Sequence, residues 1–196
     1  MIKLPNPKKE GDFSLEKIID QRRTRREFVK KPIDLEELSQ LLWAGQGITD
    51  PGKTKRAAPS AGATYPYEIL VSVKNIDGLD SDTYKYIRED NKLKPLNMEV
   101  SDELEESAFN QGFFENSAAN IILAADYEKT TSKYEEKGVR YVHIEAGHIG
   151  QNICLQAESL GLGTVLVGSF DDEKVKGILR LKERDIIYIL SIGNLK

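Results

Sequence analysis

Five consecutive residues near the start of the chain, Arg22 to Arg26, comprise four arginines and one threonine. Four guanidinium groups in so short a segment repel one another, so a folded protein needs a reason to hold them together. Arginine presents a rigid fork of N–H donors that matches phosphate oxygens, and Thr24 adds a hydroxyl donor. Taken alone, the segment is more typical of a solvated basic face or a nucleic-acid-binding patch, and an anion clamp is the other interpretation that it leaves open.

A second stretch, residues 56–67, combines small residues with two prolines. Between Ser60 and Gly62 few side chains stand in the way, so a flat ring could approach the backbone closely and meet its N–H groups. A plain loop that enters a strand is the alternative, and the pattern alone favours this alternative.

The composition describes a soluble globular protein of 196 residues, of which 39% are hydrophobic and 31% are charged. We expect an N-terminal arm over residues 1–13, because Pro5, Pro7 and Gly11 disfavour regular structure, and a single domain over residues 14–196. No apolar run approaches the ~20 residues that a membrane helix needs, and the first residues lack the apolar stretch of a signal peptide. The expected location is therefore the cytoplasm, without a membrane partner.

The charge distribution argues against nucleic acid as a partner. Residues 1–60 hold 13 of the 28 Lys and Arg but only 9 of the 32 Asp and Glu, which leaves 15 against 23 in the remainder. Non-specific nucleic-acid binding draws on a broad positive field, whereas a local positive pocket in an acidic body fits a small anionic ligand better. Because the chain has one cysteine, Cys154, and two histidines, we expect neither an internal disulfide nor a Cys- or His-rich metal site.

Two helices are expected to position these segments. Ser14 is a good N-cap for a short amphipathic helix that delivers the arginines at its C-terminal end, where the macrodipole favours cations. Asp34 caps a second helix that ends near residues 45–47. The remaining expected elements are strands at residues 68–74, 83–87, 92–96, 119–127, 164–167 and 186–192, a helix at residues 102–109 capped by Ser101, and a helix from residue 171 or 172 to about 179.

The longest expected element is a helix over roughly residues 140–160. Apolar or small residues occupy nearly every face of this helix, which predicts that nearly its whole surface is buried. Gly147 and Gly150 each cost about 1 kcal/mol against alanine in a helix interior, so they indicate another backbone packed close by. A central helix shared with a second subunit explains both points. His143 and His148 do not share a face, and we interpret them as interior or interface residues.

Taken in order, these segments resemble the FMN-dependent nitroreductase family. The family pattern has an early helix that ends in Arg-Arg-Ser/Thr-x-Arg, as at residues 22–26, followed by Pro-Ser-Ala-Gly-x-x-x-Pro before a strand, as at residues 59–66. A long glycine-containing helix, then Leu-Gly-Leu-Gly-Thr at 160–164 and Val-Gly-Ser-Phe-Asp at 167–171, completes the pattern. The resemblance spans about Leu15 to Gly193.

One branch of the family is most similar to this chain. Residues 59–66, together with Gln151 and Asn152 in the long helix, match the branch that includes dehydrogenases of thiazoline and oxazoline rings. The resemblance implies an α+β fold, a three-layer sandwich with a central, mainly antiparallel sheet flanked by helices. It also implies an intertwined homodimer with two FMN sites at the subunit interface.

The resemblance also implies roles for individual residues. Those that would hold the FMN phosphate and ribityl chain are Arg22, Arg23, Thr24 and Arg26. Those that would line the flavin from the other subunit are Pro59, Ser60, Ala61 and Gly62. Those that would lie beside the ring, with a backbone N–H directed at flavin N5, are Val167 and Gly168. Arg25 occupies the variable position and should point elsewhere.

The chain departs from the family at two places. Ala63 and Tyr65 stand where the common form has Asn and Gln, so contacts to the ring edge are lost or replaced. A basic residue after the last strand is reduced to Lys196, which predicts weaker FMN binding than in fuller-length relatives. The residues we expect around a substrate pocket are Tyr65, Gln111, Phe113 and Phe114, although the two phenylalanines are more typical of a core.

The implied function is two-electron flavin chemistry. NAD(P)H or another donor would reduce FMN, and a small electron-poor acceptor would take the hydride in a ping-pong reaction. The flavin carries this chemistry, so no catalytic side chain and no metal are nominated. The alternatives are a non-catalytic flavin- or small-anion-binding protein, a dehydrogenase of azoline-type rings and a nucleic-acid-binding module. The sequence leaves open the physiological substrate and the choice between NADH and NADPH.

Overall fold

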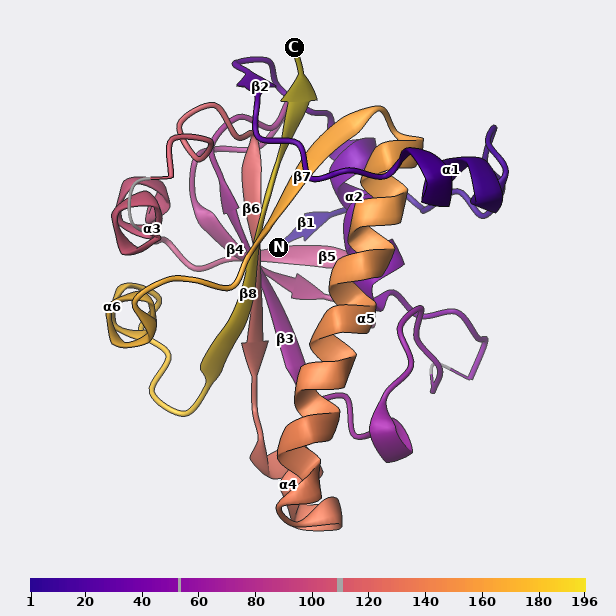
Figure 1. Cartoon of the computed structure of the whole chain (residues 1–196), viewed down its shortest axis with the longest axis vertical. Helices are drawn as coiled ribbons and strands as arrows, with labels where there is room; N and C mark the ends of the chain where they lie inside the picture. Colours follow the sequence, from indigo (N-terminus) through magenta and orange to yellow (C-terminus); the bar gives the residue numbers. More distant parts are fainter. Residues whose placement is uncertain (53, 109–110) are drawn as a thin grey trace.

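The computed structural model describes residues 1–52, 54–108 and 111–196, which form an eight-stranded sheet with helices on both faces (Figure 1). The strands are β1 (Ile2–Lys3), β2 (Phe28–Val29), β3 (Tyr67–Val73), β4 (Thr83–Ile87), β5 (Lys92–Pro95), β6 (Ala119–Ala125), β7 (Leu162–Val167) and β8 (Asp185–Leu195). The helices are α1 (Leu15–Gln21), α2 (Leu35–Gln46), α3 (Ser101–Ser107), α4 (Glu128–Tyr134), α5 (Lys137–Ser159) and α6 (Asp172–Ile178), with a short 3-10 turn η1 at Ala61–Ala63.

The named strands pair antiparallel throughout the described residues, in the order β1-β5-β4-β3-β6-β8-β2, with β7 also paired to β8. At the centre, Leu70 of β3 pairs with Ile122 of β6, which in turn pairs with Ile189 of β8. Both β3 and β6 are largely apolar runs, as expected of strands that are covered on both faces. The α+β class with a mainly antiparallel central sheet is therefore confirmed.

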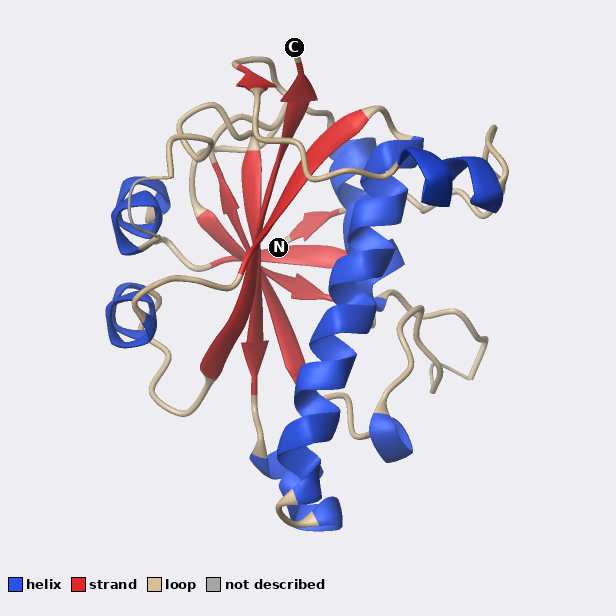
Figure 2. Ribbon diagram, viewed as in Figure 1, coloured by secondary structure: helices blue, strands red, loops and turns tan. Residues whose placement is uncertain are grey.

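Separate pairs of helices cover the two faces of the sheet. α2 and α5 pack together on one side, and α3 and α6 pack together on the other (Figures 1 and 2). Along β3, Ile69 and Val71 belong to the core beneath α2 and α5, whereas Leu70 belongs to the core beneath α3 and α6. This alternation follows the two-residue period of a strand and confirms the three-layer sandwich.

Hydrogen bonds at the helix starts explain why three helices begin where the sequence predicts. The Ser14 hydroxyl accepts from the Lys17 amide at 3.3 Å. At α2 the Asp34 carboxylate accepts from the Glu37 amide at 2.7 Å, and the Glu37 carboxylate accepts from the Asp34 amide at 2.8 Å, a complete capping box. α6 begins directly after Asp171, whose carboxylate caps the first turn. These starts are confirmed.

Three segments differ from the expectation. The arm is not wholly irregular, because Ile2–Lys3 pair with β5 and Leu4 is buried in the core. α4 was not predicted, and the long helix begins at Lys137 rather than near residue 140. Ser101 is the first residue of α3 rather than its cap, and the expected end at Phe109 lies outside the described residues. Among the described helices, none has the combined length and apolar character needed to cross a bilayer.

The outer face of α5 is exposed in the single chain. Ile144 is 48% exposed, and no atom lies within 4 Å of a Cβ added at Gly147. Gly150 does need its small size, because an added Cβ would lie 2.8 Å from a leucine side chain of β7. Burial of α5 on all sides is therefore wrong for one chain. Close packing is found at Gly150 and not at Gly147, and at Gly150 it is against the side chains of Leu166 and Tyr188 rather than against another backbone. His143 and His148 are also exposed, so their interpretation as interior residues is wrong, and an interface role stays a prediction.

Candidate functional site

The arginine segment runs between α1 and β2 without regular secondary structure. α1 ends where the Arg22 amide donates to the Ile18 carbonyl at 2.9 Å. The segment is held against β7 by the Arg25 amide, which donates to the Thr164 carbonyl at 3.0 Å. The backbone at both positions is therefore fixed by neighbouring elements.

Two of the four guanidinium groups are engaged by this chain. Arg23 Nη1 donates to the Asp20 carbonyl at 2.6 Å and to the Arg22 carbonyl at 2.9 Å, which satisfies carbonyl groups at the C-terminal end of α1. Arg25 Nη2 lies 3.3 Å from Glu158 Oε1 near the end of α5. Arg25 is thus committed to α5, as expected for the variable position.

The other two guanidinium groups have no such contact. In the part of the chain that the structure describes, neither the Arg22 nor the Arg26 side chain has a hydrogen bond or an ion pair. Arg26 borders an open hollow of about 440 Å³ together with Thr24, Arg25, Glu27, Leu195 and Lys196, and Arg22 is not among the residues that line it. Unpaired cations beside a hydroxyl donor are suited to an anion, and Lys196 lies where it can contribute.

The loop that carries residues 59–62 has a strained backbone. Gly62 (φ 56°), Ala63 (φ 55°) and Tyr65 (φ 47°) all lie in the left-handed region. For a residue with a side chain this conformation costs about 1 kcal/mol or more, and it persists where surrounding contacts hold it. Residues 59–62 themselves are exposed or half-buried, so a ligand can reach them.

Three contacts hold Tyr65. Its amide donates to the Ser60 hydroxyl at 2.9 Å, and its own hydroxyl donates to the Thr54 carbonyl at 3.1 Å. The guanidinium carbon of Arg56 lies 3.8 Å from the centre of the Tyr65 ring, a close cation–π contact. These contacts fix the position of the half-buried Tyr65 ring.

A buried polar chain that the sequence analysis did not identify lies behind this loop. Arg56 Nη1 donates to Gln46 Oε1 at 3.1 Å, and Gln46 Nε2 donates to Glu145 Oε1 at 3.1 Å. Burial raises the pKa of Glu145 to about 7, although the Ser60 hydroxyl and two neighbouring arginines counteract the rise. Burial also lowers the pKa of Arg56 to about 10. The available signal was Gln46 and Glu145 on the buried faces of α2 and α5, where Glu145 lies among apolar residues.

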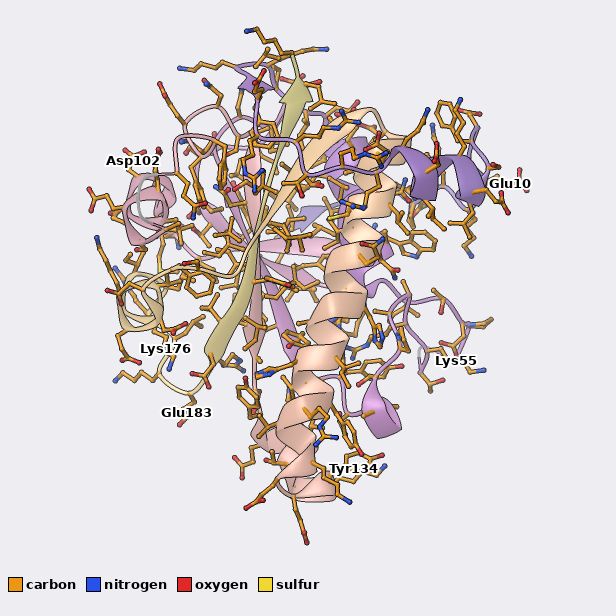
Figure 3. All side chains as sticks on the ribbon, in the orientation of Figure 1. Glu10, Lys55, Asp102, Tyr134, Lys176 and Glu183 are labelled. Atoms are coloured by element: carbon orange, nitrogen blue, oxygen red, sulfur yellow. The ribbon has the colours of Figure 1, made fainter. Side chains whose placement is uncertain are left out.

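Two residues of α4 meet the same loop. Lys133 Nζ donates to the Gly62 carbonyl at 3.3 Å. A Cβ added at Gly62 would lie 2.6 Å from Lys133 Nζ and would collide with Tyr134 Oη, so a side chain at this position would displace the ends of both side chains. Figure 3 shows Tyr134 where α4 meets α5, on the side of the molecule that also carries Lys55. The sequence analysis missed these contacts because it did not predict α4.

Val167 and Gly168 lie at the end of β7. Val167 is buried and pairs with Ile189 of β8, and Gly168, the next residue, is exposed. The Gly168 amide therefore lies beyond the paired part of the ladder. A Cβ added at Gly168 would lie 3.3 Å from the Tyr188 ring, which leaves little room for a side chain. The placement of both residues beside a flavin stays a prediction.

The four residues predicted for a substrate pocket do not gather within one chain. Phe113 and Phe114 stack with ring centroids 4.9 Å apart in the core beneath α3 and α6. Gln111 is exposed nearby and donates to the Ala108 carbonyl, whereas Tyr65 lies on the side of α5. The interpretation of the two phenylalanines as core residues is confirmed. A role of all four in substrate binding stays a prediction.

The arginine segment and the loop lie at opposite ends of α5. Arg25 contacts Glu158, whereas Ser60 neighbours Glu145, 13 residues earlier. At 1.5 Å per residue, these positions are about 20 Å apart along the helix. One chain therefore does not bring the two predicted parts of a cofactor site together.

This architecture, a three-layer sandwich with a long helix laid across a mainly antiparallel sheet, is that of nitroreductase-like proteins. The model of the nitroreductase family matches residues 19–194, nearly the whole chain. The chain belongs to the nitroreductase family, and this membership makes it an oxidoreductase of the nitroreductase type.

Two relatives and one solved structure are similar to this chain. A protein of Methanocaldococcus jannaschii named as a nitroreductase is 43% identical over 183 residues, which cover 93% of this chain and 91% of the relative. A solved structure from Ralstonia eutropha, also named as a nitroreductase, has a TM-score of 0.85 and 23% identity over 100% of this chain and 89% of that one. The microcin B17-processing protein McbC of Escherichia coli is 26% identical over 164 residues, which cover 80% of this chain and 60% of McbC. The predicted family resemblance is confirmed, with McbC as a distant relative.

Proposed function

We propose that the protein is an FMN-dependent oxidoreductase that transfers a hydride between NAD(P)H, or another donor, and a small electron-poor acceptor. The observation that carries this proposal is the division among the arginines. Within the described residues Arg22 and Arg26 lack a partner, whereas Arg23 and Arg25 have carbonyl or carboxylate partners. The unpaired Arg26 lines one hollow with Thr24 and Lys196, and the unpaired Arg22 lies two residues before Thr24 in the sequence, a set that suits a doubly charged phosphate.

The residues of the arginine segment fit the FMN phosphate. Arg22 and Arg26 would bind its oxygens, Thr24 would donate a further hydrogen bond, and Lys196, which borders the same hollow, would add a cation. Arg23 uses the same nitrogen for both of its carbonyl contacts, so its other N–H groups remain available to the ligand.

The small-residue loop fits the flat part of the cofactor. Residues 59–62 offer exposed or half-buried backbone with little side-chain bulk, and the exposed Gly168 follows the last paired residue of β7. Together with Val167, these residues would line the ring. FMN supplies two-electron chemistry when bound, whereas the protein supplies binding, orientation and electrostatics.

The separation of these two parts supports a homodimer. Each site would combine the arginine segment of one subunit with residues 59–62 of the other, because the two segments of one chain lie at opposite ends of α5. The single chain also exposes large apolar side chains on or next to α1 and α5, which a second subunit would cover. These side chains are Phe13, Leu15, Ile19, Val139 and Ile144.

The first test is the colour of the purified protein. It should show a visible flavin band and release FMN on denaturation, or gain both after reconstitution with FMN. Colourless protein that cannot be reconstituted would contradict the proposal. Oxidation of NADH or NADPH with a quinone or a nitroarene then separates an enzyme from a non-catalytic flavin-binding protein.

A second candidate reaction follows from the branch resemblance of residues 59–66 and from the similarity to McbC. In this reaction a thiazoline or oxazoline ring would be the hydride donor. A peptide that carries such a ring should then bleach the flavin band without NAD(P)H, and a persistent band would exclude this donor class.

A further inference from the structure

The loop of residues 56–65 depends on contacts from outside itself. Ala63 and Tyr65 both have a left-handed φ although neither is glycine. Within the short turn η1 the Ala63 and Thr64 amides make backbone hydrogen bonds of 3.2 Å. Such strained positions persist only where the surroundings over-determine them, so the question is which residues hold this loop.

One buried carboxyl lies at the junction of two arms that reach the loop. In the first arm Glu145 accepts from Gln46, and Gln46 accepts from Arg56, both at 3.1 Å. In the second arm the Ser60 hydroxyl neighbours the Glu145 carboxyl. Both arms end on Tyr65, because Arg56 stacks on its ring and the Ser60 hydroxyl accepts from its amide at 2.9 Å.

We propose that Glu145 is a positioning residue that holds residues 56–65 and the Tyr65 ring, and that it thereby sets which acceptors fit beside the cofactor. This inference rests on the proposed function, since it takes residues 59–62 as the lining of a flavin site. Glu145 acts through Ser60 and through Gln46 and Arg56 and has no direct contact with Tyr65.

The surroundings of Glu145 leave it little other role. The groups that face it are Gln46 of α2, Arg56 and Ser60 of the loop, Arg88 after β4 and Tyr67 of β3. The residue is 2% exposed, so its oxygens need hydrogen-bond donors from the protein. Its neighbouring donors, Gln46 and Ser60, are the first members of the two arms. Loss of the carboxyl would leave the buried Gln46 amide and the half-buried Ser60 hydroxyl without this acceptor.

Four variants and one control separate positioning from simple packing, and one of the four, Tyr65→Ala, removes the ring itself. Glu145→Leu keeps the approximate volume and removes the acceptors, Glu145→Gln keeps one acceptor oxygen, and Arg56→Met cuts the first arm at the loop. Asn152→Ala is the matched control, because Asn152 also joins α5 to α2, with its Nδ2 donating to the Ala44 carbonyl at 3.0 Å, and among the described residues its side chain makes no hydrogen bond to the loop.

The first readout needs no cofactor. In the apo full-length chain, hydrogen exchange of the amides in residues 57–65 should accelerate about tenfold in Glu145→Leu and in Arg56→Met, as expected for one lost charge-assisted contact. Exchange in Glu145→Gln should stay within about threefold of wild type, and exchange in Asn152→Ala should not change. Exchange in the Glu145→Leu/Arg56→Met double variant should be little faster than in either single variant, because both substitutions interrupt the same chain of hydrogen bonds.

The second readout uses the FMN-loaded protein. Tyr65→Ala, Glu145→Leu and Arg56→Met should each shift the ratio of kcat/KM for a bulky quinone against a small one by about tenfold toward the bulky one, mainly through KM. Unchanged exchange in Glu145→Leu, with a fall in Tm like that of Asn152→Ala, would overturn the inference. An unchanged quinone ratio in an active protein would overturn its acceptor part alone. If hydrogen exchange accelerates as expected but the protein binds no FMN, the proposed function is wrong, whereas the positioning role of Glu145 stands.

Discussion

The Arg25 guanidinium lies 3.3 Å from the Glu158 carboxylate of α5, and this contact separates Arg25 from the other arginines of its segment. The side chain of Glu158 is only 13% exposed, so its charge needs a partner within the protein. Together with the backbone bond from Arg25 to Thr164, the pair fastens the segment to the C-terminal end of α5. Arg25 therefore has a structural role, which leaves Arg22 and Arg26 for a ligand.

Arg25→Ala should lower stability without a matching loss of FMN binding. A partly exposed ion pair contributes about 0.2–1 kcal/mol, and the half-buried Glu158 left alone adds to the loss. Thermal denaturation should show a lower Tm, while titration should give an FMN Kd within about threefold of wild type. A loss of FMN affinity as large as that of Arg26→Ala would show that Arg25 also contacts the phosphate.

Gly62→Ala should disturb the loop more than an equally strained glycine elsewhere. Both Gly62 (φ 56°) and Gly78 (φ 82°) are left-handed, but a Cβ at Gly62 meets Lys133 and Tyr134, whereas nothing lies within 4 Å of a Cβ at Gly78. Gly78→Ala is therefore the matched control and should cost about 1 kcal/mol from strain alone. Gly62→Ala should add only a small further loss in urea denaturation, because the atoms that its Cβ meets are the ends of two flexible side chains, and it should weaken FMN binding by displacing Lys133 from the Gly62 carbonyl. If Gly62→Ala and Gly78→Ala lower the unfolding free energy equally and the FMN affinity of Gly62→Ala is unchanged, a tight contact at Gly62 is excluded.

The buried Glu145 predicts a specific pH dependence of stability. Burial raises its pKa from 4.5 to about 7, so the folded protein holds this proton more tightly than the unfolded chain does. The contribution to stability is therefore complete below pH 4.5 and is lost as the pH rises to about 7, a change of about 3 kcal/mol. The unfolding free energy of wild type should fall relative to that of Glu145→Gln as the pH rises over this range. At higher pH the difference between the two proteins should stay constant. Parallel curves from pH 4 upward would refute the raised pKa.

Much of the fold could be predicted from local patterns. Ser14 and Asp34 set helix starts through hydrogen bonds to residues three positions on, and such pairs can be recognised in the sequence. β1 escaped prediction because its two residues form a strand only where β5 offers an open edge. α4 escaped because the sequence of Glu128–Tyr134 carries two β-branched threonines and no apolar stripe.

The candidate site could be predicted only in residue type. Four arginines indicated an anion, but which of them stay unpaired depends on Glu158, 133 positions from Arg25 in the sequence. The contact between Gln46 and Glu145 spans 99 positions in the same way. The first pairing is decided by how the arginine segment packs on α5 and the second by how α2 packs on α5, and no local pattern of the chain contains either.

The exposed face of α5 predicts how the dimer can be broken. Ile144→Lys places a charge on the face that we expect the second subunit to cover, so it should shift the protein toward monomer in analytical ultracentrifugation. FMN should be lost at the same time, because each site would need both subunits. Glu183→Lys, on the opposite side of the molecule (Figure 3), is the control for an added positive charge and should leave both properties unchanged. A monomeric wild-type protein that binds FMN would contradict the two-subunit site.

The central claim is that Arg22 and Arg26 bind the phosphate of FMN, and the comparison of FMN with riboflavin tests it most directly. Riboflavin carries the same ring without the phosphate, so its Kd should be nearly equal in wild type, Arg25→Ala and the Arg22→Ala/Arg26→Ala double variant. The FMN Kd should rise about 100-fold in the double variant alone, as expected for the loss of two charge-assisted contacts. An FMN Kd that stays at the wild-type value in the double variant would contradict the account.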